Sequence, residues 1–543
     1  MISFQGVSKQ YGGQVLFLEA DFQLNPGEKV GLVGANGAGK STIFRLITGE
    51  EAPDDGMVDK PKRVTIGYFK QTVGDMGGRS VMAETMSGAG EVGALGVELA
   101  ELEPRLGDVD APDFDKVIER YSDVQMRFSE LGGYDLEPRA HAILAGLGFP
   151  VEQIEGDVGR LSGGWKMRVA LAQILLGKPE VLLLDEPTNY LDIESILWLE
   201  DFLKAYQGAL IMTCHDKDVM NRVVKKILEI DGGELRSFTG DYDFYERMRA
   251  EEAQRREAQY ERQQAMLAKE QLFIDRFKAQ AAKASQVQSR IKKLDKIEKF
   301  EAPKRIIEKT FDFRTPPRSG DDVIRCESLV KTYGPRVVHD NMNLLVRRGE
   351  RWAIMGENGA GKTTLLKMMA GETQPDGGQV VVGASCTIGY FAQHQMEQLT
   401  GQATILEELQ AHAPLANIGT LRTLAGAFGF HGDDHDKKIY VLSGGEKSRL
   451  ALAKILYDAP NVLLFDEPTN HLDLVTKRAV LKALVNYEGT IVFVSHDRSF
   501  LRAIATKVLE LRVGKEPVLY GGTYDEYVQQ TGREAPGMRQ LSA

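Results

Sequence analysis

The sequence predicts an α/β fold: two tandem domains with mainly parallel sheets, joined by a long α-helical hairpin linker, with a small helical arm inserted in the first domain. Three observations predict it. Two glycine-rich motifs, GANGAGKS (34–41) and GENGAGKT (356–363), lie 322 residues apart. Later motifs repeat with an offset of 281 residues. Short apolar segments such as VLLLDEP and VLLFDEP, which are typical of buried parallel strands, alternate with helix-forming stretches.

Composition bounds the class of protein. A chain of 543 residues is too long for a single core, and 43% hydrophobic with 27% charged residues is ordinary for a globular protein. We find no uninterrupted apolar run of membrane-spanning length, and the N-terminus lacks the basic start and apolar stretch of a secretory signal. Three scattered cysteines form no metal or disulfide pattern. A cytoplasmic location is therefore expected.

The repeat defines the domains. The matching lysines Lys40 and Lys362 are 322 positions apart, whereas the matching aspartates Asp185 and Asp466 are only 281 apart. The first half therefore carries about 41 extra residues before Leu161. Within them, two amphipathic stretches separated by DVDAPD predict a helical arm. The predicted organisation is a first domain at 1–240 with its arm at about 90–132, a charged helical linker at 241–321, a second domain at 322–527 and a short disordered tail at 528–543.

The glycine-rich motifs match the phosphate-binding loop pattern. In that pattern backbone N–H groups cradle nucleotide phosphates, a lysine neutralises their charge, and a hydroxyl reaches Mg²⁺. Two such loops predict two nucleotide sites. The residues predicted to line them are Gly34, Ala35, Asn36, Gly37, Ala38, Gly39, Lys40, Ser41 and Thr42 in the first half, and Gly356, Glu357, Asn358, Gly359, Ala360, Gly361, Lys362, Thr363 and Thr364 in the second.

Further motifs follow each loop in the same order. LSGG opens a helix whose N–H groups and dipole suit an anion. An acidic strand then ends in Asp-Glu, where the aspartate could hold Mg²⁺ and the glutamate could orient or deprotonate water. A histidine after the next apolar strand could contact a γ-phosphate. A DE pair alone could cap a helix, and a lone histidine is more often structural, but the repeated order favours catalysis. These residues are Ser162, Gly163, Gly164, Asp185, Glu186 and His215, and Ser443, Gly444, Gly445, Asp466, Glu467 and His496.

This series resembles the ATP-binding-cassette (ABC) family of P-loop NTPases. The resemblance implies ATP hydrolysis with Mg²⁺, by two cassettes of one monomeric chain paired head to tail. It implies that Lys40 shares a site with Ser443–Gly445, and Lys362 with Ser162–Gly164. Tyr11 and Tyr333 resemble the aromatics that stack on adenine. The implied Mg²⁺ ligands are Ser41, Gln71 and Asp185 in one site, and Thr363, Gln393 and Asp466 in the other.

The two halves differ beside these motifs. Trp165 follows the first LSGG where Glu446 follows the second, and Cys214 precedes the first histidine where Ser495 precedes the second. None of these differences removes a phosphate or metal ligand. They predict unequal turnover at two sites that both bind nucleotide.

The linker is basic although the whole chain carries −11. Residues 276–299 hold eight Lys/Arg against two Asp/Glu, in sequence that forms helices and has no proline. A helical hairpin with a basic tip suits a phosphate backbone, whereas the charge alone favours a solvated coiled-coil spacer. The candidate RNA-binding residues are Arg276, Lys278, Lys283, Arg290, Lys292 and Lys293.

The string FIDRFKAQAAKASQVQSRIKKL (273–294) resembles the interdomain linker of ABC-F proteins. That resemblance implies a translation factor whose ATP-bound form occupies the ribosomal E site, touches ribosomal RNA and P-site transfer RNA, and leaves on hydrolysis. It implies that the arm meets the L1 stalk or large-subunit RNA. Residues 91–130 hold eleven acidic and four basic residues, which favours a protein neighbour or packing on the arm's own cassette. The alternatives are an ATPase subunit of a transporter with separate membrane partners, and a DNA-repair-type cassette ATPase.

Overall fold

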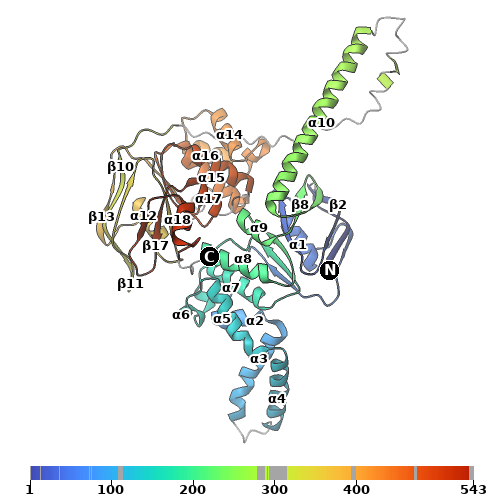
Figure 1. The fold of residues 1–543 in the computed structure, drawn as a ribbon, viewed down its shortest axis with the longest axis vertical. Coiled ribbons are helices and arrows are strands. Elements are labelled where there is room, and N and C mark those ends of the chain that lie inside the picture. The colour runs from blue at the N-terminus through green and yellow to red at the C-terminus, as the bar shows by residue number, and fades with distance from the viewer. Residues whose placement is uncertain are drawn as a thin grey trace.

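The computed structural model describes residues 2–12, 14–35, 37–72, 74, 76–107, 114–277, 288–289, 291–292, 315–392, 399–469, 472 and 474–536. Two α/β cassettes lie side by side in it (Figure 1). A long helix, α10 (Tyr242–Phe277), leaves the first cassette in one direction, and a two-helix arm leaves it in the opposite direction.

A six-stranded sheet forms the centre of the first cassette, in the order β5-β6-β7-β3-β8-β9. All neighbouring pairs are parallel except β8 and β9. Both VLLLD and ALIMT are buried at every position, which places them in the middle of the sheet. The strands are β3 (Lys29–Gly34), β5 (Ile66–Phe69), β6 (Val181–Asp185), β7 (Ala209–Thr213), β8 (Lys226–Asp231) and β9 (Glu234–Thr239).

A second, antiparallel sheet covers helix α1 (Lys40–Thr48) in this cassette. Phe17 of the small sheet and Ile43 and Phe44 of α1 are fully buried and belong to one core cluster with the central strands. The phosphate-loop helix is thereby held between two sheets. The small sheet has the order β2-β1-β4, with β1 (Ile2–Tyr11), β2 (Gln14–Leu24) and β4 (Asp55–Asp59).

The second cassette repeats this plan. Its large sheet has the order β14-β15-β16-β12-β17-β18 and its small sheet the order β11-β10-β13. The predicted α/β class with mainly parallel sheets is therefore confirmed in both halves. The strands are β10 (Asp322–Tyr333), β11 (Arg336–Arg347), β12 (Arg351–Gly356), β13 (Gly377–Val382), β14 (Ile388–Phe391), β15 (Val462–Asp466), β16 (Thr490–Val494), β17 (Lys507–Leu511) and β18 (Val518–Tyr520).

Helices complete each cassette around the LSGG motif. In both halves that motif opens a long helix, α7 or α15, whose apolar side is buried. The first cassette has α2 (Val81–Ser87), α5 (Leu136–Gly146), α6 (Val151–Ile154), α7 (Gly163–Leu176), α8 (Ile193–Ala205) and α9 (Lys217–Val223). The second has α12 (Lys362–Met369), α13 (Ile405–His412), α14 (Ile418–Ala427), α15 (Gly444–Tyr457), α16 (Leu474–Asn486), α17 (Arg498–Ile504) and α18 (Tyr524–Thr531).

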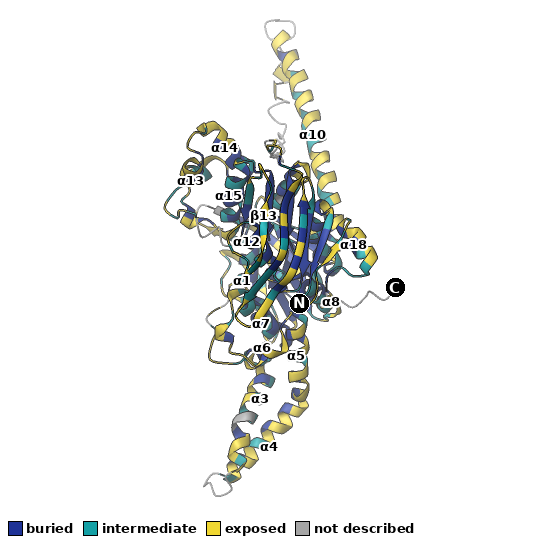
Figure 2. Cartoon of the chain, turned by 90° about the vertical axis from the view of Figure 1, so that its left-hand side faces the viewer, coloured by how far each residue is buried: buried dark blue, intermediate teal, exposed yellow. Residues whose placement is uncertain are grey.

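The extra residues of the first half include the arm, which consists of α3 (Gly90–Leu102) and α4 (Phe114–Glu130). The two helices share a small core of their own, built on Leu102, Val117 and Val124. The outer faces of α3 and α4 are exposed over most of their length (Figure 2). The arm thus lies where the amphipathic pattern predicts it.

The linker begins with α10 (Tyr242–Phe277), a single helix of 36 residues. It projects well clear of both cassettes (Figure 1), and most of its surface is exposed (Figure 2). The predicted long helix is present. The predicted return leg of the hairpin falls on 278–287, 290 and 293–314, which lie outside the described residues.

The prediction of a disordered tail is wrong for residues 528–536. Helix α18 continues to Thr531, and the chain then packs back against the protein, where Ala535 is fully buried. The hydroxyl of Tyr524 donates to the carbonyl of Glu534 at 2.8 Å. Sequence composition favoured disorder because glycine and proline follow the helix, but these contacts fix the segment. Residues 537–543 lie outside the described part of the chain.

The two cassettes contact each other directly. Ile193 and Leu197 at the start of α8 join the core cluster of the second cassette. The Lys477 ammonium in α16 donates to the carbonyl of His215 at 3.0 Å, and Arg502 Nη1 lies 2.8 Å from Asp218 Oδ2. Among the described helices, none combines the length and apolarity needed to cross a lipid bilayer.

Candidate functional site

The glycine-rich loop of the first cassette connects β3 to α1. Gly37 and Gly39 have φ of 79° and 104°, a left-handed conformation that side chains disfavour. A Cβ on Gly39 would also lie 3.1 Å from Leu16 Cδ1. At the start of α1, Lys40 Nζ donates to the carbonyls of Gly34 at 2.8 Å and Ala35 at 3.1 Å. The lysine is thus held inside the loop that the motif predicts to cradle phosphate.

An acidic strand end faces this loop. Ser41 Oγ donates to Asp185 Oδ2 at 2.7 Å, and Thr213 Oγ1 donates to Asp185 Oδ1 at 2.7 Å. Burial raises the pKa of Asp185, although both hydroxyls oppose that shift. A hydroxyl beside a carboxylate, with Gln71 lining the same cavity, is a set of oxygen donors that suits Mg²⁺.

Glu186 follows Asp185 with φ of 53°, a strained conformation for a glutamate. His215 Nε2 lies 2.9 Å from its Oε1, and Asn189 Nδ2 donates to its Oε2 at 2.7 Å. Burial opposes ionisation, but His215 and Asn189 outweigh it and lower the pKa of Glu186 to about 2. The carboxylate is therefore charged and fixed in position.

Lys40, Ser41, Asp185 and Glu186 line one cavity of about 820 Å³ together with residues of the other cassette. Ser443, Gly444 and Gly445, at the start of α15, form the facing wall. Tyr11 lines the cavity edge and is 44% exposed, with its hydroxyl donating to Glu51. We call this cavity and its lining the Lys40 site. It brings together residues 400 positions apart in the pairing that the family resemblance implies.

Sequence reasoning missed four charged residues that line the Lys40 site: Arg45 from the first cassette, and Lys437, Glu446 and Arg449 from the second. The signal was present for Arg449, because an arginine also stands six residues after the first signature serine, at Arg168. Glu446 caps its own helix: its Oε2 lies 2.8 Å from both the N and the Oγ of Ser443.

The second loop repeats the first. Lys362 Nζ donates to the carbonyls of Gly356 at 2.5 Å and Glu357 at 3.1 Å. Glu467 has φ of 52°, and His496 Nε2 lies 3.3 Å from its Oε1. Burial, and then the neighbouring Asp466, raise the pKa of Glu467 to about 8. The two glutamates therefore have matching geometry and opposite pKa shifts.

The first cassette reaches this second region, the Lys362 site, through the residues that begin α8. Asp192, Ile193 and Glu194 line a small cavity of about 10 Å³ with Gly356 and His496. Burial, followed by the charges of Asp192 and Glu357, raises the pKa of Glu194 to about 8. The pairing of Lys362 with Ser162–Gly164 stays a prediction.

Several predicted site residues line neither the Lys40 cavity nor the small cavity at the Lys362 site. Tyr333 is 52% exposed, with Lys331 Nζ 5.6 Å from its ring centroid. Lys292 is exposed, and Arg276 lies near the end of α10. Predicted site residues outside the described part of the chain are Asn36, Lys278, Lys283, Arg290, Lys293 and Gln393.

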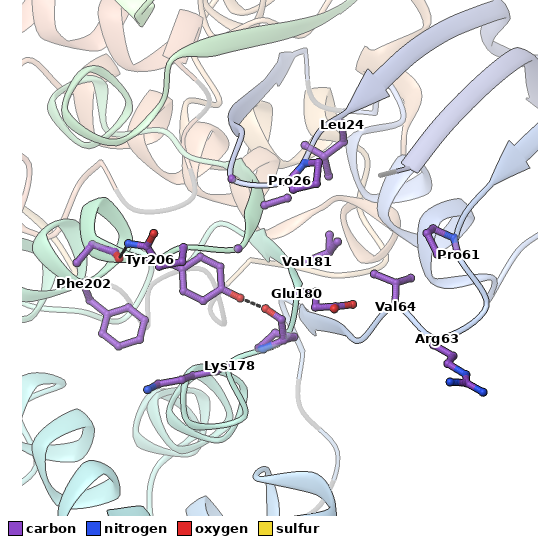
Figure 3. Close-up of a pocket in the computed structure, with 16 residues that line it drawn as sticks. Leu24, Pro26, Pro61, Arg63, Val64, Lys178, Glu180, Val181, Phe202 and Tyr206 are labelled. Carbon is purple, nitrogen blue, oxygen red and sulfur yellow. Dashed lines mark hydrogen bonds between the residues drawn. The ribbon is translucent and has the colours of Figure 1, made fainter. Parts of the chain in front are cut away.

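A separate cavity of about 760 Å³ lies where strands β6 and β7 begin. Val64, Phe202 and Tyr206 give it a mainly apolar lining, with Arg63 and Lys178 at its border (Figure 3). It contains none of the phosphate-loop or signature residues. The nucleotide chemistry therefore belongs to the Lys40 and Lys362 sites.

Comparisons with known proteins agree with this geometry. A family model described as ABC transporter matches residues 17–189 and 339–470, and a second model of the same description matches 228–313. The chain is 38% identical to the probable ATP-binding protein YheS of Escherichia coli K12, covering 97% of this chain and 81% of that protein. It is 33% identical to ABC transporter F family member 2 of Arabidopsis thaliana, over 97% and 79%.

Among solved structures, the archaeal ribosome recycling factor aABCE1, in complex with ribosomal stalk protein aP1, has a similar fold. The TM-score is 0.61 at 18% identity, over 98% of this chain and 94% of that one. Together with the paired motifs, these matches establish ATP binding and hydrolysis. The chain belongs to the ABC-F family of tandem ATP-binding-cassette ATPases.

Proposed function

We propose that this protein is an ATP-dependent translation factor whose closed cassettes bind the E site of the ribosome. Its basic linker contacts P-site transfer RNA, and ATP hydrolysis releases it. The observation that carries the proposal is the Lys40 site, where the phosphate loop of one cassette and the signature of the other line one cavity. A nucleotide in that cavity contacts both cassettes, so binding favours the closed pair and hydrolysis weakens it.

The residues of the Lys40 site have defined tasks in this proposal. When bound, ATP with Mg²⁺ supplies the anhydride bond that is cleaved. Ser41, Asp185 and Gln71 would hold the metal, and Thr363, Gln393 and Asp466 would do so at the Lys362 site. Glu186 Oε1 and Oε2 are fixed by His215 and Asn189, which leaves an ionised carboxylate to orient the attacking water.

The linker is anchored where it can sense closure. Glu246, in the second turn of α10, lies 3.0 Å from Lys217 Nζ of the first cassette and pairs with Arg478 of the second. Lys217 is two residues from His215. A helix whose base touches both cassettes changes direction when they separate, so closure sets where α10 points.

The charge of the linker supports a nucleic-acid target. Residues 276–299 carry a local excess of six positive charges in a chain of net −11. Such a concentrated charge binds phosphate backbones with strong salt dependence. Structurally similar aABCE1 is named a ribosome recycling factor, which supports the ribosome as the target here.

The arm suits a protein neighbour better than RNA. Two of its four basic residues are already paired with carboxylates: Arg120 Nε lies 2.6 Å from Glu98 Oε1, and Arg127 Nε lies 3.0 Å from Glu91 Oε1. The remaining acidic residues give the arm a negative surface that repels phosphate. We therefore assign the arm a basic protein of the L1 stalk region as its contact.

Charge reversal at the linker tip tests the target. The triple variant Arg290→Glu, Lys292→Glu and Lys293→Glu is expected to weaken ATP-dependent co-sedimentation with ribosomes by about tenfold or more, because each phosphate contact adds to the electrostatic binding energy. Its affinity for ATP is expected to be unchanged. Titrating ribosomes at two salt concentrations measures the effect, and the variant should show a shallower salt dependence.

A matched control reverses three cations elsewhere. Lys62, Arg63 and Lys178 are exposed on the first cassette and do not belong to the linker (Figure 3 shows the last two). Changing them to glutamate alters the net charge equally and should leave ribosome binding close to that of the parent. Equal loss in both triple variants would contradict a specific tip contact, and recovery of the parent protein with membranes would favour a transporter subunit.

A further inference from the structure

We propose that Glu534, in the segment after α18, is a positioning residue for the Lys362 site. It completes a ring of charges that holds the histidine-bearing end of the second cassette against α8 of the first. The segment was expected to be unstructured, yet it lies at the junction of the cassettes. The proposal concerns the ATPase itself and does not depend on the ribosomal role.

The ring contains four residues, two from each cassette. Glu534 Oε1 accepts from Arg222 Nη2 at 2.7 Å, and its Oε2 accepts from Arg498 Nη1 at 3.1 Å. Glu200 closes the ring: its Oε2 accepts from Arg222 Nη1 at 3.0 Å, and its Oε1 accepts from Arg498. Each carboxylate therefore bridges an arginine of the first cassette and an arginine of the second.

Burial makes this ring sensitive to the loss of any member. Arg498 and Glu200 are each 1% exposed. A buried charge network stabilises only when its members are mutually satisfied, and removing one partner leaves the others poorly compensated. Asp216 and Asp218 also lie 3.7 and 3.6 Å from Arg498, but neither is paired with Arg222. Glu534 and Glu200 are therefore the two carboxylates that couple the arginine of α9 to that of α17, and Glu534 is the one that comes from the chain end.

The ring is directly connected to the Lys362 site. Arg498 is the first residue of α17 and stands two positions after His496. Ala535 and Pro536, next to Glu534, line the same small cavity as Asp192 and His496. Seating Glu534 thus packs the chain end against the site and fixes the segment that carries His496.

Among the described residues, the Lys40 site has no equivalent ring at the corresponding positions. With the offset of 281, the counterparts of Glu200 and Arg222 are Leu481 and Ala503, which carry no charge. The counterpart of Arg498 is Lys217, which pairs instead with Asp243 and Glu246 of the linker helix. Loss of Glu534 should therefore affect the two sites unequally.

The test introduces Glu534→Gln into two full-length chains, each able to turn over ATP at one site. Glu186→Gln leaves the Lys362 site active, and Glu467→Gln leaves the Lys40 site active. In the first chain we expect kcat to fall about tenfold, because losing a charge-assisted hydrogen bond loosens the segment that carries His496. In the second we expect a change of less than about twofold. Glu534→Asp should restore part of the loss.

Hydrogen exchange provides a readout independent of turnover. Glu534→Gln should speed exchange of the α17 amides about tenfold, with and without ATP, and leave α16 unchanged, because α16 makes its own contacts to the first cassette. Asp525→Asn is the matched control: Asp525 pairs with Arg502 of α17 but is exposed, so both readouts should stay near those of the parent. Equal losses at both sites, or unchanged exchange in α17, would overturn the proposal.

Discussion

Replacing both Glu186 and Glu467 with glutamine is expected to lower ATP turnover by about 10²–10⁴-fold and to retain the protein on ribosomes. Glutamine keeps the shape of the side chain, and at Glu186 it can still meet His215 and accept from Asn189. It cannot take a proton from water. Nucleotide should therefore bind normally and keep the cassettes closed. Turnover by phosphate release and retention by co-sedimentation in ATP measure the two effects.

The single variants serve as controls for the double variant. Each should retain turnover at its intact site, and the two residual rates should differ, because the pKa of Glu186 is lowered to about 2 and that of Glu467 is raised to about 8. A double variant that hydrolyses ATP normally would remove both glutamates from the reaction. A double variant that hydrolyses no ATP but sediments free of ribosomes would support the role of the glutamates in hydrolysis and refute the ribosomal proposal.

The substitution Gly444→Asp, in the LSGG motif of the second cassette, is expected to abolish turnover at the Lys40 site. Gly444 lines the cavity opposite Lys40, and a Cβ there would have no heavy atom within 4 Å. The new side chain therefore fits sterically but places a negative charge where phosphate must bind. Two like charges about 4 Å apart repel by roughly 4 kcal/mol at an effective dielectric constant of about 20, which corresponds to a loss of about 10²–10³-fold.

Gly163 provides the matched variant in the first cassette, since a Cβ on it also meets no heavy atom within 4 Å. In a chain carrying Glu467→Gln, where only the Lys40 site turns over, Gly444→Asp should be inactive and Gly163→Asp active. In a chain carrying Glu186→Gln the pattern should reverse. Steady-state ATPase rates of the four chains show which LSGG motif serves which nucleotide site. The opposite pattern would show that each cassette uses its own signature.

Sequence and structure agree most closely where local chemistry fixes the backbone. The glycine-rich loops, the doubly apolar strands β6 and β15 and the arm helices lie where the motifs and periodicity predict them. Each depends on residues close together in the chain: glycines that permit left-handed turns, apolar runs buried on both faces, and a polar segment between two amphipathic stretches. The order of the motifs also indicated two equivalent halves.

The contribution of Arg449 had only one sequence signal, the matching position of Arg168, and that of Glu534 had none. Arg449 belongs to the Lys40 site only because α15 is brought opposite a loop 400 residues earlier. Glu534 stands in a stretch rich in glycine and proline that locally favours disorder, and it is fixed by arginines far away in sequence. Long-range electrostatic partners leave no periodic pattern in the chain.

The sequence by itself determined the two-cassette architecture and the basic character of the linker, and it predicted which residues hold phosphate and metal and which are catalytic. Only the tertiary structure decided which loop faces which signature at the Lys40 site, how α10 is anchored between the cassettes, and that the chain end closes a charged ring beside His496. The physical reason is that motifs encode local backbone geometry, whereas the junction depends on side chains that meet only after both cassettes have folded.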